Sequence, residues 1–598
     1  MCGIAGIWSL ENKDDNRKLI ELMKTAIKHR GPDGHGSWFS SNGSLALGHQ
    51  RLSIIDLSSH AAQPMTLDEE LVITYNGEIY NYIEIRKELK ELGFSFKTQS
   101  DTEVLLTSYK VWGIDMLQRL DGMFSIAIYD IAKDELFIAR DRFGEKPFYY
   151  TKFNNKLYFG SELKALFAGG VPKRNNNRML YNFLANDLVE NPNDQQETFY
   201  ENIFKLKPSH YCIIKKDLNI EQRQYWNLDI TTNKSISFDE ATNKFYDLLS
   251  LSVKRRLRSD VKVGNSLSGG LDSSAIVGLV SKENDIINTF SARFPNFKKD
   301  EGYFINLVQD KFKTVHHDVR VDENSLVSHL DRLIYHQDEP FQTGSIFAQY
   351  KVYEAAKKQG ITVMLDGQGA DEYLCGYHKD FNFFYRELIR IKQTNDLIVK
   401  HLNTNHNFVP DTSFKEFFHV KNPVIFNFLR NNFSFLIPKS PPHEINKDFN
   451  MNYKPKKSPF LDPLTLKEML KGEMTTQGIE KLLRFSDRNS MAHSVEVRLP
   501  FLFHELVGFV LSLPSELLLK EGWSKAILRN SVKDLLPTEI VHRKDKVGFE
   551  APHNVWTKSK TLQEMIYEAR THLIKENIIT KDYKSDWKIL IVYKSMFS

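Results

Sequence analysis

A cysteine stands at the second position of the chain, where one residue can supply two catalytic groups. Removal of Met1, which a small residue at position 2 favours, would leave a thiol and a free α-amino group on Cys2. An α-amine has an ordinary pKa of roughly 7.7 to 8.0, so it can accept the thiol proton near neutral pH. Because the thiolate is the reactive form, Cys2 is a candidate nucleophile that carries its own base.

A glycine-rich run offers a second kind of chemistry. Ser266-Leu267-Ser268-Gly269-Gly270-Leu271-Asp272-Ser273-Ser274 follows a β-like segment and precedes a helical one. The backbone amides of such a turn, with a helix amino terminus, can cradle phosphate. The Gly-Lys-Ser/Thr ending of a Walker loop is absent from this run, which disfavours a kinase or ATPase of that type. The bland alternative is a serine-capped helix after a tight turn.

The composition is that of a globular protein with several domains. A chain of 598 residues is too long for one ordinary hydrophobic core, so two to four domains are expected. Hydrophobic residues make up 41% and charged residues 26%, which disfavours wholesale disorder and fibrous architecture. The formal charge of +4, from 80 basic and 76 acidic residues, gives no general case for nucleic-acid or membrane binding.

Cysteine usage and apolar runs indicate a reducing compartment. Cys2, Cys212 and Cys375 have no metal-site spacing and cannot all pair, so we expect a cytoplasmic protein. No apolar run approaches the roughly 18 residues of a membrane span. Residues 1–10 lack the charged leader and the length of a secretion signal. The basic run at 254–258 favours a solvated helix face.

The elements that must position these groups differ between the two parts of the chain. Short β-rich runs are expected at 4–9, 45–49, 71–75, 124–130, 135–140 and 156–160. Helical patterns interrupt them at 16–28, 81–92 and 102–112. The sequence therefore predicts an α+β sandwich in the amino-terminal part.

From about residue 236 the pattern changes to helices with a few buried strands. Helices are expected at 238–257 and from 273, and strands at 261–266, 288–293 and 362–365. This alternation predicts an α/β domain with a parallel sheet and many helices. The polar segment 216–236 is the expected linker, and 395–475 is expected to be an irregular insertion or helical lobe.

Five motifs surround Cys2 in a fixed order. They are Met1-Cys2-Gly3-Ile4-Ala5-Gly6, His29-Arg30-Gly31-Pro32-Asp33-Gly34, Gly48-His49-Gln50-Arg51-Leu52-Ser53, Tyr75-Asn76-Gly77-Glu78-Ile79-Tyr80-Asn81 and Ser100-Asp101-Thr102-Glu103. Together they resemble the class II glutamine amidotransferase domain. The resemblance implies a fold of the N-terminal nucleophile hydrolase type over residues 1–215. A further matching run, 139–147, is expected to be structural, with Arg140 and Asp141 in a buried ion pair.

The resemblance implies a role for each polar group of this domain. Cys2 would attack the side-chain amide of glutamine, while Asn76 and the backbone at Gly77 donate hydrogen bonds to the oxyanion. Arg51 would hold the α-carboxylate of glutamine through a bidentate fork. Glu78 and Asp101 would hold the α-ammonium.

The serine-glycine run resembles the pyrophosphatase loop of enzymes that split ATP into AMP and pyrophosphate. The contacts that this resemblance implies are Ser268, Gly269, Gly270 and Ser273 to pyrophosphate, Asp272 and Asp371 to Mg²⁺, and Leu267, Ala292, Asp366 and Gly367 to ATP. Downstream, 488–502 and 544–549 match the same kind of synthetase domain. A cation there can neutralise phosphate charge, and Lys546 is our candidate, with Lys544 behind it.

Together the two sets of motifs resemble the asparagine synthetases. One turn departs from the best-known members of that family: Leu365-Asp366-Gly367-Gln368-Gly369-Ala370-Asp371-Glu372. Many of them carry glutamate where Gln368 stands, at a position associated with forming the acyl-adenylate. Glutamine has no charge and cannot be a general base, so that role is lost, moved to a neighbour or positional. One branch of the family uses glutamine here. The departure leaves the acceptor substrate open.

The resemblance implies glutamine-dependent amidation of aspartate to asparagine through a β-aspartyl-adenylate. The synthetase domain would span 237–598, with ammonia passing to it through an internal tunnel. ATP would be a substrate, Mg²⁺ the cofactor, and homodimerisation is a family expectation. Three alternatives stay open: another carboxylate acceptor, such as a sugar acid or antibiotic precursor; a β-lactam synthetase; and a glutaminase with a nucleotide-sensing, non-catalytic second domain. An intact Cys2 disfavours the β-lactam synthetase, and intact Asp272 and Ser273 disfavour the sensing domain.

Overall fold

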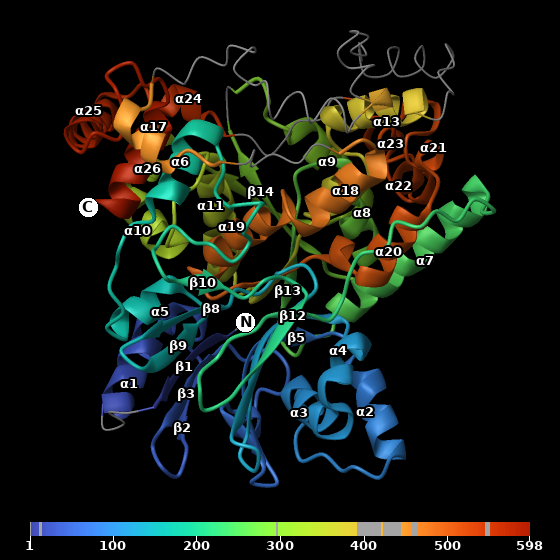
Figure 1. The fold of residues 1–598 in the computed structure, drawn as a ribbon. Coiled ribbons are helices and arrows are strands. Elements are labelled where there is room, and N and C mark those ends of the chain that lie inside the picture. The colour runs from blue at the N-terminus through green and yellow to red at the C-terminus, as the bar shows by residue number, and fades with distance from the viewer. Residues whose placement is uncertain are drawn as a thin grey trace.

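The computed structural model consists of two halves that stack against each other (Figure 1). The structure describes residues 2–10, 15–294, 297–390, 420–422, 444–456, 463–544 and 551–598. The amino-terminal half, blue to teal in Figure 1, contains two six-stranded sheets. The carboxyl-terminal half surrounds one five-stranded sheet with helices.

The amino-terminal sheets are antiparallel. In spatial order the first contains β10 (Phe204–Lys205), β8 (Tyr149–Phe153), β9 (Lys156–Gly160), β1 (Gly3–Ser9), β3 (Leu45–Arg51) and β2 (Gly34–Phe39). The second contains β12 (Arg223–Gln224), β11 (His210–Ile214), β7 (Glu135–Arg140), β6 (Gly122–Asp130), β5 (Leu71–Ile79) and β4 (Met65–Leu67).

Side-chain alternation along β1 explains how the sheets stack. Ile4 and Trp8 pack in the core between the two sheets, whereas Ala5 and Ile7 pack in the core on the opposite face. That outer face is covered by α1 (Asn16–Ala26) and α5 (Leu163–Ala168). The helices α2 (Tyr82–Glu91) and α3 (Asp101–Trp112) cover the second sheet. The result is a four-layered α+β sandwich, as the sequence predicts.

The carboxyl-terminal sheet is parallel throughout. Its order is β15 (Val315–Arg320), β14 (Asn288–Arg293), β13 (Val263–Ser266), β16 (Val363–Leu365) and β17 (Glu496–Arg498). The principal helices around it are α7 (Phe238–Arg256), α8 (Leu271–Val280), α9 (Gly302–Phe312), α10 (Glu323–Gln337), α11 (Ser345–Lys358), α12 (Ala370–Tyr373), α13 (His378–Arg390), α18 (Leu466–Thr475), α19 (Ile479–Met491), α20 (His504–Ser512), α25 (Lys560–Lys575) and α26 (Asp586–Met596). Ligands of open parallel sheets bind at the carboxyl ends of strands, where the turns after β13 and β16 meet.

Most predicted elements are confirmed, and the differences have local causes. β14 and β7 have the predicted bounds, whereas β5 and β6 extend beyond theirs. The predicted linker segment contributes β12, which pairs with β11 and so extends the amino-terminal sheet. Of the predicted insertion at 395–475, the structure describes α17 (Lys447–Tyr453), α18 and short flanking segments.

Buried charges join the two halves. Arg30, which is fully buried, donates to Glu162 at 2.7 Å and to Asp487 of α19 at 2.8 Å. Arg140 pairs with Glu480 of the same helix at 2.9 Å. The expected ion pair between Arg140 and Asp141 is therefore wrong. Asp141 instead accepts main-chain hydrogen bonds from the residues that follow it.

Replacing Arg30 with alanine is expected to destabilise the protein by about 3–5 kcal/mol, because two buried carboxylates would each lose one of the cations that pair with them. The measurement is the midpoint of urea unfolding. A matched control is Arg119→Ala, since Arg119 pairs with Glu88 where both side chains are more than 40% exposed. Such a surface pair contributes less than about 1 kcal/mol. An unchanged midpoint for Arg30→Ala would contradict the role assigned to the buried network.

The basic run at 254–258 does not form the solvated face that its sequence suggests. Arg256 is 1% exposed, Arg255 pairs with Asp121 at 3.0 Å, and Arg258 pairs with Glu84 at 2.6 Å. These arginines attach α7 and the residues after it to the amino-terminal half. The sequence prediction was wrong because periodicity cannot distinguish a helix face in water from one that contacts a second domain.

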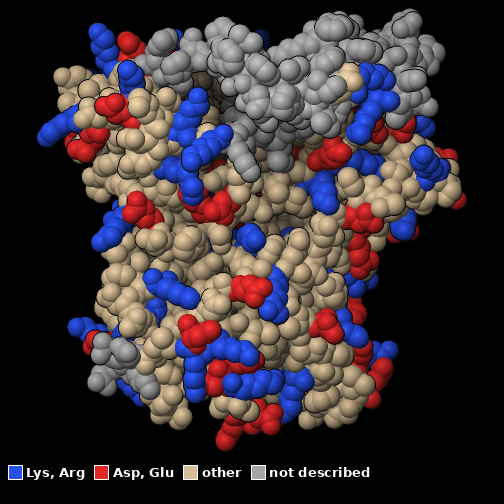
Figure 2. All heavy atoms as spheres, viewed as in Figure 1, with Lys and Arg blue, Asp and Glu red and all other residues tan. Residues whose placement is uncertain are grey.

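Charges of both signs are interspersed over the face shown in Figure 2, in keeping with the small net charge. Among the described residues, we find no helix with the length and apolarity to traverse a bilayer.

Candidate active sites

Cys2 lies just before β1, at the bottom of a small cavity in the amino-terminal half. Its nitrogen donates to Asn76 Oδ1 at 3.0 Å, and its carbonyl accepts a hydrogen bond from Arg30 Nε at 3.0 Å. Burial raises the pKa of the Cys2 thiol. A thiol with a raised pKa is a poor nucleophile unless a base accepts its proton.

Asn76 and Gly77 are neighbours on β5: Gly77 lines this cavity, and Asn76 contacts the Cys2 nitrogen. Asn76 Nδ2 is buried and has no hydrogen-bond partner among the residues that the structure describes. A buried amide without a partner costs free energy, so this donor is available for a substrate oxygen. A side chain at Gly77 would place its Cβ 2.1 Å from the Met123 carbonyl oxygen of β6. Only glycine therefore allows this strand to pass the cavity in its present register.

Of the four predicted glutamine-binding side chains, three line the same cavity, and the fourth, Asn76, contacts Cys2. The three are Arg51, Glu78 and Asp101. Arg51 is held by main-chain carbonyls of the following loop, including Ser58 O at 2.7 Å. Asp101 is the first residue of α3, where Ser100 caps the helix. It accepts hydrogen bonds from Tyr75 Oη at 2.9 Å and the Ile79 amide at 3.0 Å.

Glu78 and Asp101 are two of the three acidic side chains that line this cavity, the third being Glu496. Burial raises the pKa of both Glu78 and Asp101, and the charge of Asp101 raises that of Glu78 further. A cationic ligand between them would offset this repulsion. The pair is therefore suited to an ammonium group.

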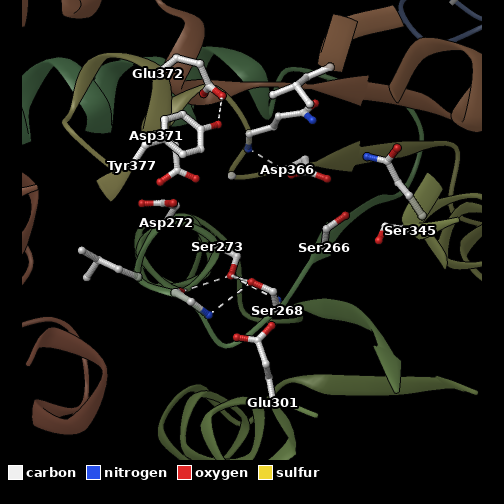
Figure 3. Close-up of a pocket in the computed structure, with 18 of the residues that line it drawn as sticks. Ser266, Ser268, Asp272, Ser273, Glu301, Ser345, Asp366, Asp371, Glu372 and Tyr377 are labelled. Carbon is white, nitrogen blue, oxygen red and sulfur yellow. Dashed lines mark hydrogen bonds between the residues drawn. The ribbon is translucent and has the colours of Figure 1, made fainter. Parts of the chain in front are cut away.

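A larger cavity of about 480 Å³ lies at the carboxyl ends of the parallel strands (Figure 3). The loop between β13 and α8 forms its floor, and Ser268 Oγ lies 3.1 Å from Ser273 Oγ. Gly269 has φ +73°, and a Cβ there would lie 2.9 Å from the Ile305 amide. The glycine is thus required both for the left-handed turn and for packing against α9.

The predicted ATP-binding residues gather at this cavity. The lining includes Leu267, Ser268, Gly270, Asp272, Ser273, Ala292, Asp366 and Gly367, and also Gln368; Gly269 of the same loop is not among the lining residues. The Gln368 amide donates to Asp366 Oδ1 at 3.1 Å, which closes the turn after β16. Gln368 Oε1 has no partner among the described residues, so this side chain is a candidate to contact substrate.

Asp272 and Asp371, the predicted metal ligands, lie next to each other at one side of the cavity in Figure 3. The sequence did not identify the residue that joins them: Lys525 Nζ lies 2.5 Å from Asp272 Oδ2 and 2.6 Å from Asp371 Oδ1. Burial opposes the charge of Lys525, but the two carboxylates raise its pKa above the ordinary value. A lone lysine in Ser524-Lys525-Ala526 carries no pattern that could have predicted this position.

The predicted cation Lys546 lies outside the described residues. Lys544, the second candidate, lines the larger cavity at the parallel sheet, and its Nζ lies 5.5 Å from the centre of the Trp523 ring. Arg543, also missed by sequence reasoning, lines the cavity and pairs with Glu301 at 2.8 Å. The glutamine cavity likewise has an unpredicted wall, because Glu496 of β17 lines it.

Comparisons with known proteins agree with this geometry. A glutamine amidotransferase domain family matches residues 1–226, and the asparagine synthase family matches residues 244–584. Glutamine-hydrolysing asparagine synthetase 1 of Bacillus subtilis is 30% identical and is matched over 98% of this chain and 92% of its own length. The chain belongs to the asparagine synthase family.

Two further relatives frame this membership. Glutamine-hydrolysing asparagine synthetase 3 of Bacillus subtilis is 30% identical, over 93% of this chain and 88% of its own length. A protein of Gibberella zeae named Amidase chry2 is 28% identical, over 96% of this chain and 91% of its own length. As a member of the asparagine synthase family, the chain is a glutamine-dependent ligase, and ATP is a substrate in this family.

Proposed function

We propose that the protein converts aspartate to asparagine, using glutamine as nitrogen donor and ATP to activate the acceptor. The carrying observation is that one chain holds both a cysteine cavity with a free amide donor and a phosphate-type loop at a parallel sheet. We assign the glutaminase domain to 1–215, the linker to 216–236 and the synthetase domain to 237–598. Three free, buried cysteines suit a reducing cytoplasm.

The glutaminase half-reaction begins with proton transfer from the Cys2 thiol to its own amine. The sulfur attacks the glutamine amide carbon, and the developing oxyanion accepts hydrogen bonds from Asn76 Nδ2 and the Gly77 amide. The returned proton lets ammonia leave, and water then releases glutamate. Arg51 binds the α-carboxylate, while Glu78 and Asp101 bind the α-ammonium.

The synthetase half-reaction activates the acceptor at the larger cavity. A carboxylate oxygen of aspartate attacks the α-phosphorus of ATP, which expels pyrophosphate toward Ser268, Gly269, Gly270 and Ser273. Ammonia then attacks the acyl carbon of the adenylate, and AMP leaves. Lys525 lies where it can neutralise negative charge on the phosphates, and we propose Lys546 as a second such cation.

The carboxylates at this cavity fit a magnesium ion held partly by its substrate. The residues that would hold the ion are Asp272 and Asp371, whose carboxylates both contact Lys525 and so lie close together. Among the described residues, no cluster of three or more acidic, histidine or cysteine side chains offers a metal site without such help. Bound Mg²⁺ would neutralise charge on the leaving pyrophosphate.

Ammonia must reach the second cavity without loss to water. At the buried interface between the two halves, Glu496 of β17 lines the first cavity, and β17 pairs with β16, the strand that leads into the second. We propose that ammonia crosses this interface internally.

Gln368 motivates the runner-up function, an amidotransferase for another carboxylate. Its uncharged amide lines the cavity where many asparagine synthetases carry a glutamate, and it can only orient the acceptor through hydrogen bonds. Aspartate remains the first choice because full-length relatives are named asparagine synthetases.

The test is pyrophosphate release from ATP and Mg²⁺ with single candidate acids, supplied with either glutamine or ammonium. We expect release with aspartate under both nitrogen sources. Release with a sugar acid or another carboxylate, but never with aspartate, would favour the runner-up function. No release under any condition would favour a nucleotide-sensing domain.

A further inference from the structure

Strand β17 belongs to the synthetase sheet but connects the two cavities. It pairs with β16, with Leu365 opposite Arg498. The next residue, Asp366, donates its amide hydrogen to the Arg498 carbonyl at 3.0 Å. Since Asp366 opens the turn that carries Gln368, the main chain of Arg498 supports the edge of the nucleotide cavity.

The side chain of Arg498 reaches the other cavity. It is fully buried, and its Nη2 donates to Glu78 Oε2 at 3.2 Å. Its Nε donates to Glu496 Oε1 at 2.6 Å, and its Nη1 donates to the carbonyls of Arg256 and Arg258 at 2.8 and 2.6 Å. Of these four partners, Glu78 alone belongs to the amino-terminal half. The other three fix the guanidinium plane that faces it.

Glu496 strengthens this arrangement. It is fully buried and lines the glutamine cavity together with Cys2 and Asp101. Although burial alone would raise the pKa of Glu496, the positive charge of the chain's amino terminus and then that of Arg498 lower it to about 2. Glu496 is therefore ionised at neutral pH and holds one edge of the guanidinium, which leaves the other edge for Glu78.

Glu78 depends on such a cation for its charge. Burial and Asp101 both raise the pKa of Glu78, whereas Arg498 lowers it. The ionisable side chains around Glu78 are Cys2, Arg51, Tyr75, Asp101, Glu496 and Arg498. Because Arg51 is held by loop carbonyls, Arg498 is the guanidinium that contacts Glu78 directly.

We propose that Arg498 is a positioning residue shared by the two sites. Its side chain holds Glu78 in place for the glutamine ammonium, and its main-chain carbonyl holds the Asp366 turn at the larger cavity. This inference rests on the proposed function. A ligand that shifts the Asp366 turn would shift Glu78, so ATP and acceptor would change the affinity for glutamine. By linkage, glutamine would change their affinity by the same factor.

The test compares the full-length wild type with R498M and R498K. Glutamate release at varied glutamine gives KM and kcat, and ammonia-dependent pyrophosphate release in the same preparations reports the synthetase fold. We expect R498M to raise the glutamine KM at least about tenfold, the effect of a shift of one pKa unit, with ammonia-dependent release retained. R498K keeps the charge but not the fork, so its KM should fall between the two.

The pH profile separates this role from a structural one. Removing the cation raises the pKa of Glu78, so the ionised carboxylate appears only at higher pH. The acid limb of kcat/KM for glutamine should therefore move upward in R498M and return toward wild type in R498K. The matched control is R142M: Arg142 is also buried, but its nitrogens donate to the carbonyls of Leu117 and Leu120. Its KM for glutamine should not change.

The coupling is read from the glutamine KM with and without aspartate and a non-hydrolysable ATP analogue. We expect a ratio different from one in the wild type and a ratio of one in R498M. An unchanged KM in R498M, a parallel loss of both activities, or a ratio that survives the substitution would overturn the proposal. A wild type that releases no glutamate would instead overturn the proposed function, so the two failures are distinguishable.

Discussion

Replacing Cys2 with alanine is expected to abolish glutamine-dependent synthesis and to leave ammonia-dependent synthesis intact. Cys2 lies in a cavity of its own in the amino-terminal half, whereas the nucleotide loop lies in the other half. Loss of a covalent nucleophile lowers the rate at least about 10³-fold, because no neighbour can form the thioester. The measurement is product formation with glutamine and, separately, with ammonium.

Cys2→Ser serves as a companion variant, because it preserves volume and hydrogen bonding at the buried position. It should show the same pattern as the alanine variant, since a serine hydroxyl is a far weaker nucleophile near neutral pH. Loss of both activities in both variants would contradict separate sites for ammonia release and ammonia use.

Replacing Lys525 with methionine is expected to impair the synthetase reaction with both nitrogen sources and to leave glutamine hydrolysis intact. Its ammonium lies within 2.6 Å of both Asp272 and Asp371 and is 8% exposed, so no water can substitute for it easily. Removal of a buried cation at a phosphoryl-transfer site costs on the order of 10²- to 10³-fold in rate. Pyrophosphate release should fall by that factor with either nitrogen source, while basal glutamine hydrolysis is retained.

The control for Lys525→Met is Lys533→Met, an exposed lysine a few residues along the chain. It should leave pyrophosphate release unchanged. Normal release in Lys525→Met would show that the pair of carboxylates does not need this cation and would remove Lys525 from the synthetase site.

The glutamine site was largely predictable because its parts are short, contiguous motifs. Asn76, Gly77 and Glu78 share one strand, and Ser100-Asp101 begins one helix, so local spacing brings these groups to a common edge. The structure places all of the predicted glutamine-site residues at one cavity or, for Asn76, in direct contact with Cys2.

The second site shows where prediction from sequence fails. The glycines of the loop at 266–274 make it recognisable in the sequence. Lys525, however, contacts Asp272 of this region from 253 positions further along the chain. Arg498 lies in a run that matched the synthetase domain, yet its contact with Glu78 depends on the register of a three-residue strand and on domain packing. Neither feature leaves a periodic signal. The prediction of a solvated face for the arginines at 254–258 is wrong for the same reason. The surface that covers these arginines belongs to the other half.

Nitrogen is proposed to pass from glutamine to the acceptor within one molecule. The most direct measurement supplies glutamine labelled with ¹⁵N in its amide, together with ATP, Mg²⁺, aspartate and excess unlabelled ammonium, and follows ¹⁵N in asparagine. We predict that most asparagine carries the label despite the unlabelled pool. Asparagine that contains only unlabelled nitrogen, or no asparagine at all while glutamine is hydrolysed, would contradict this account.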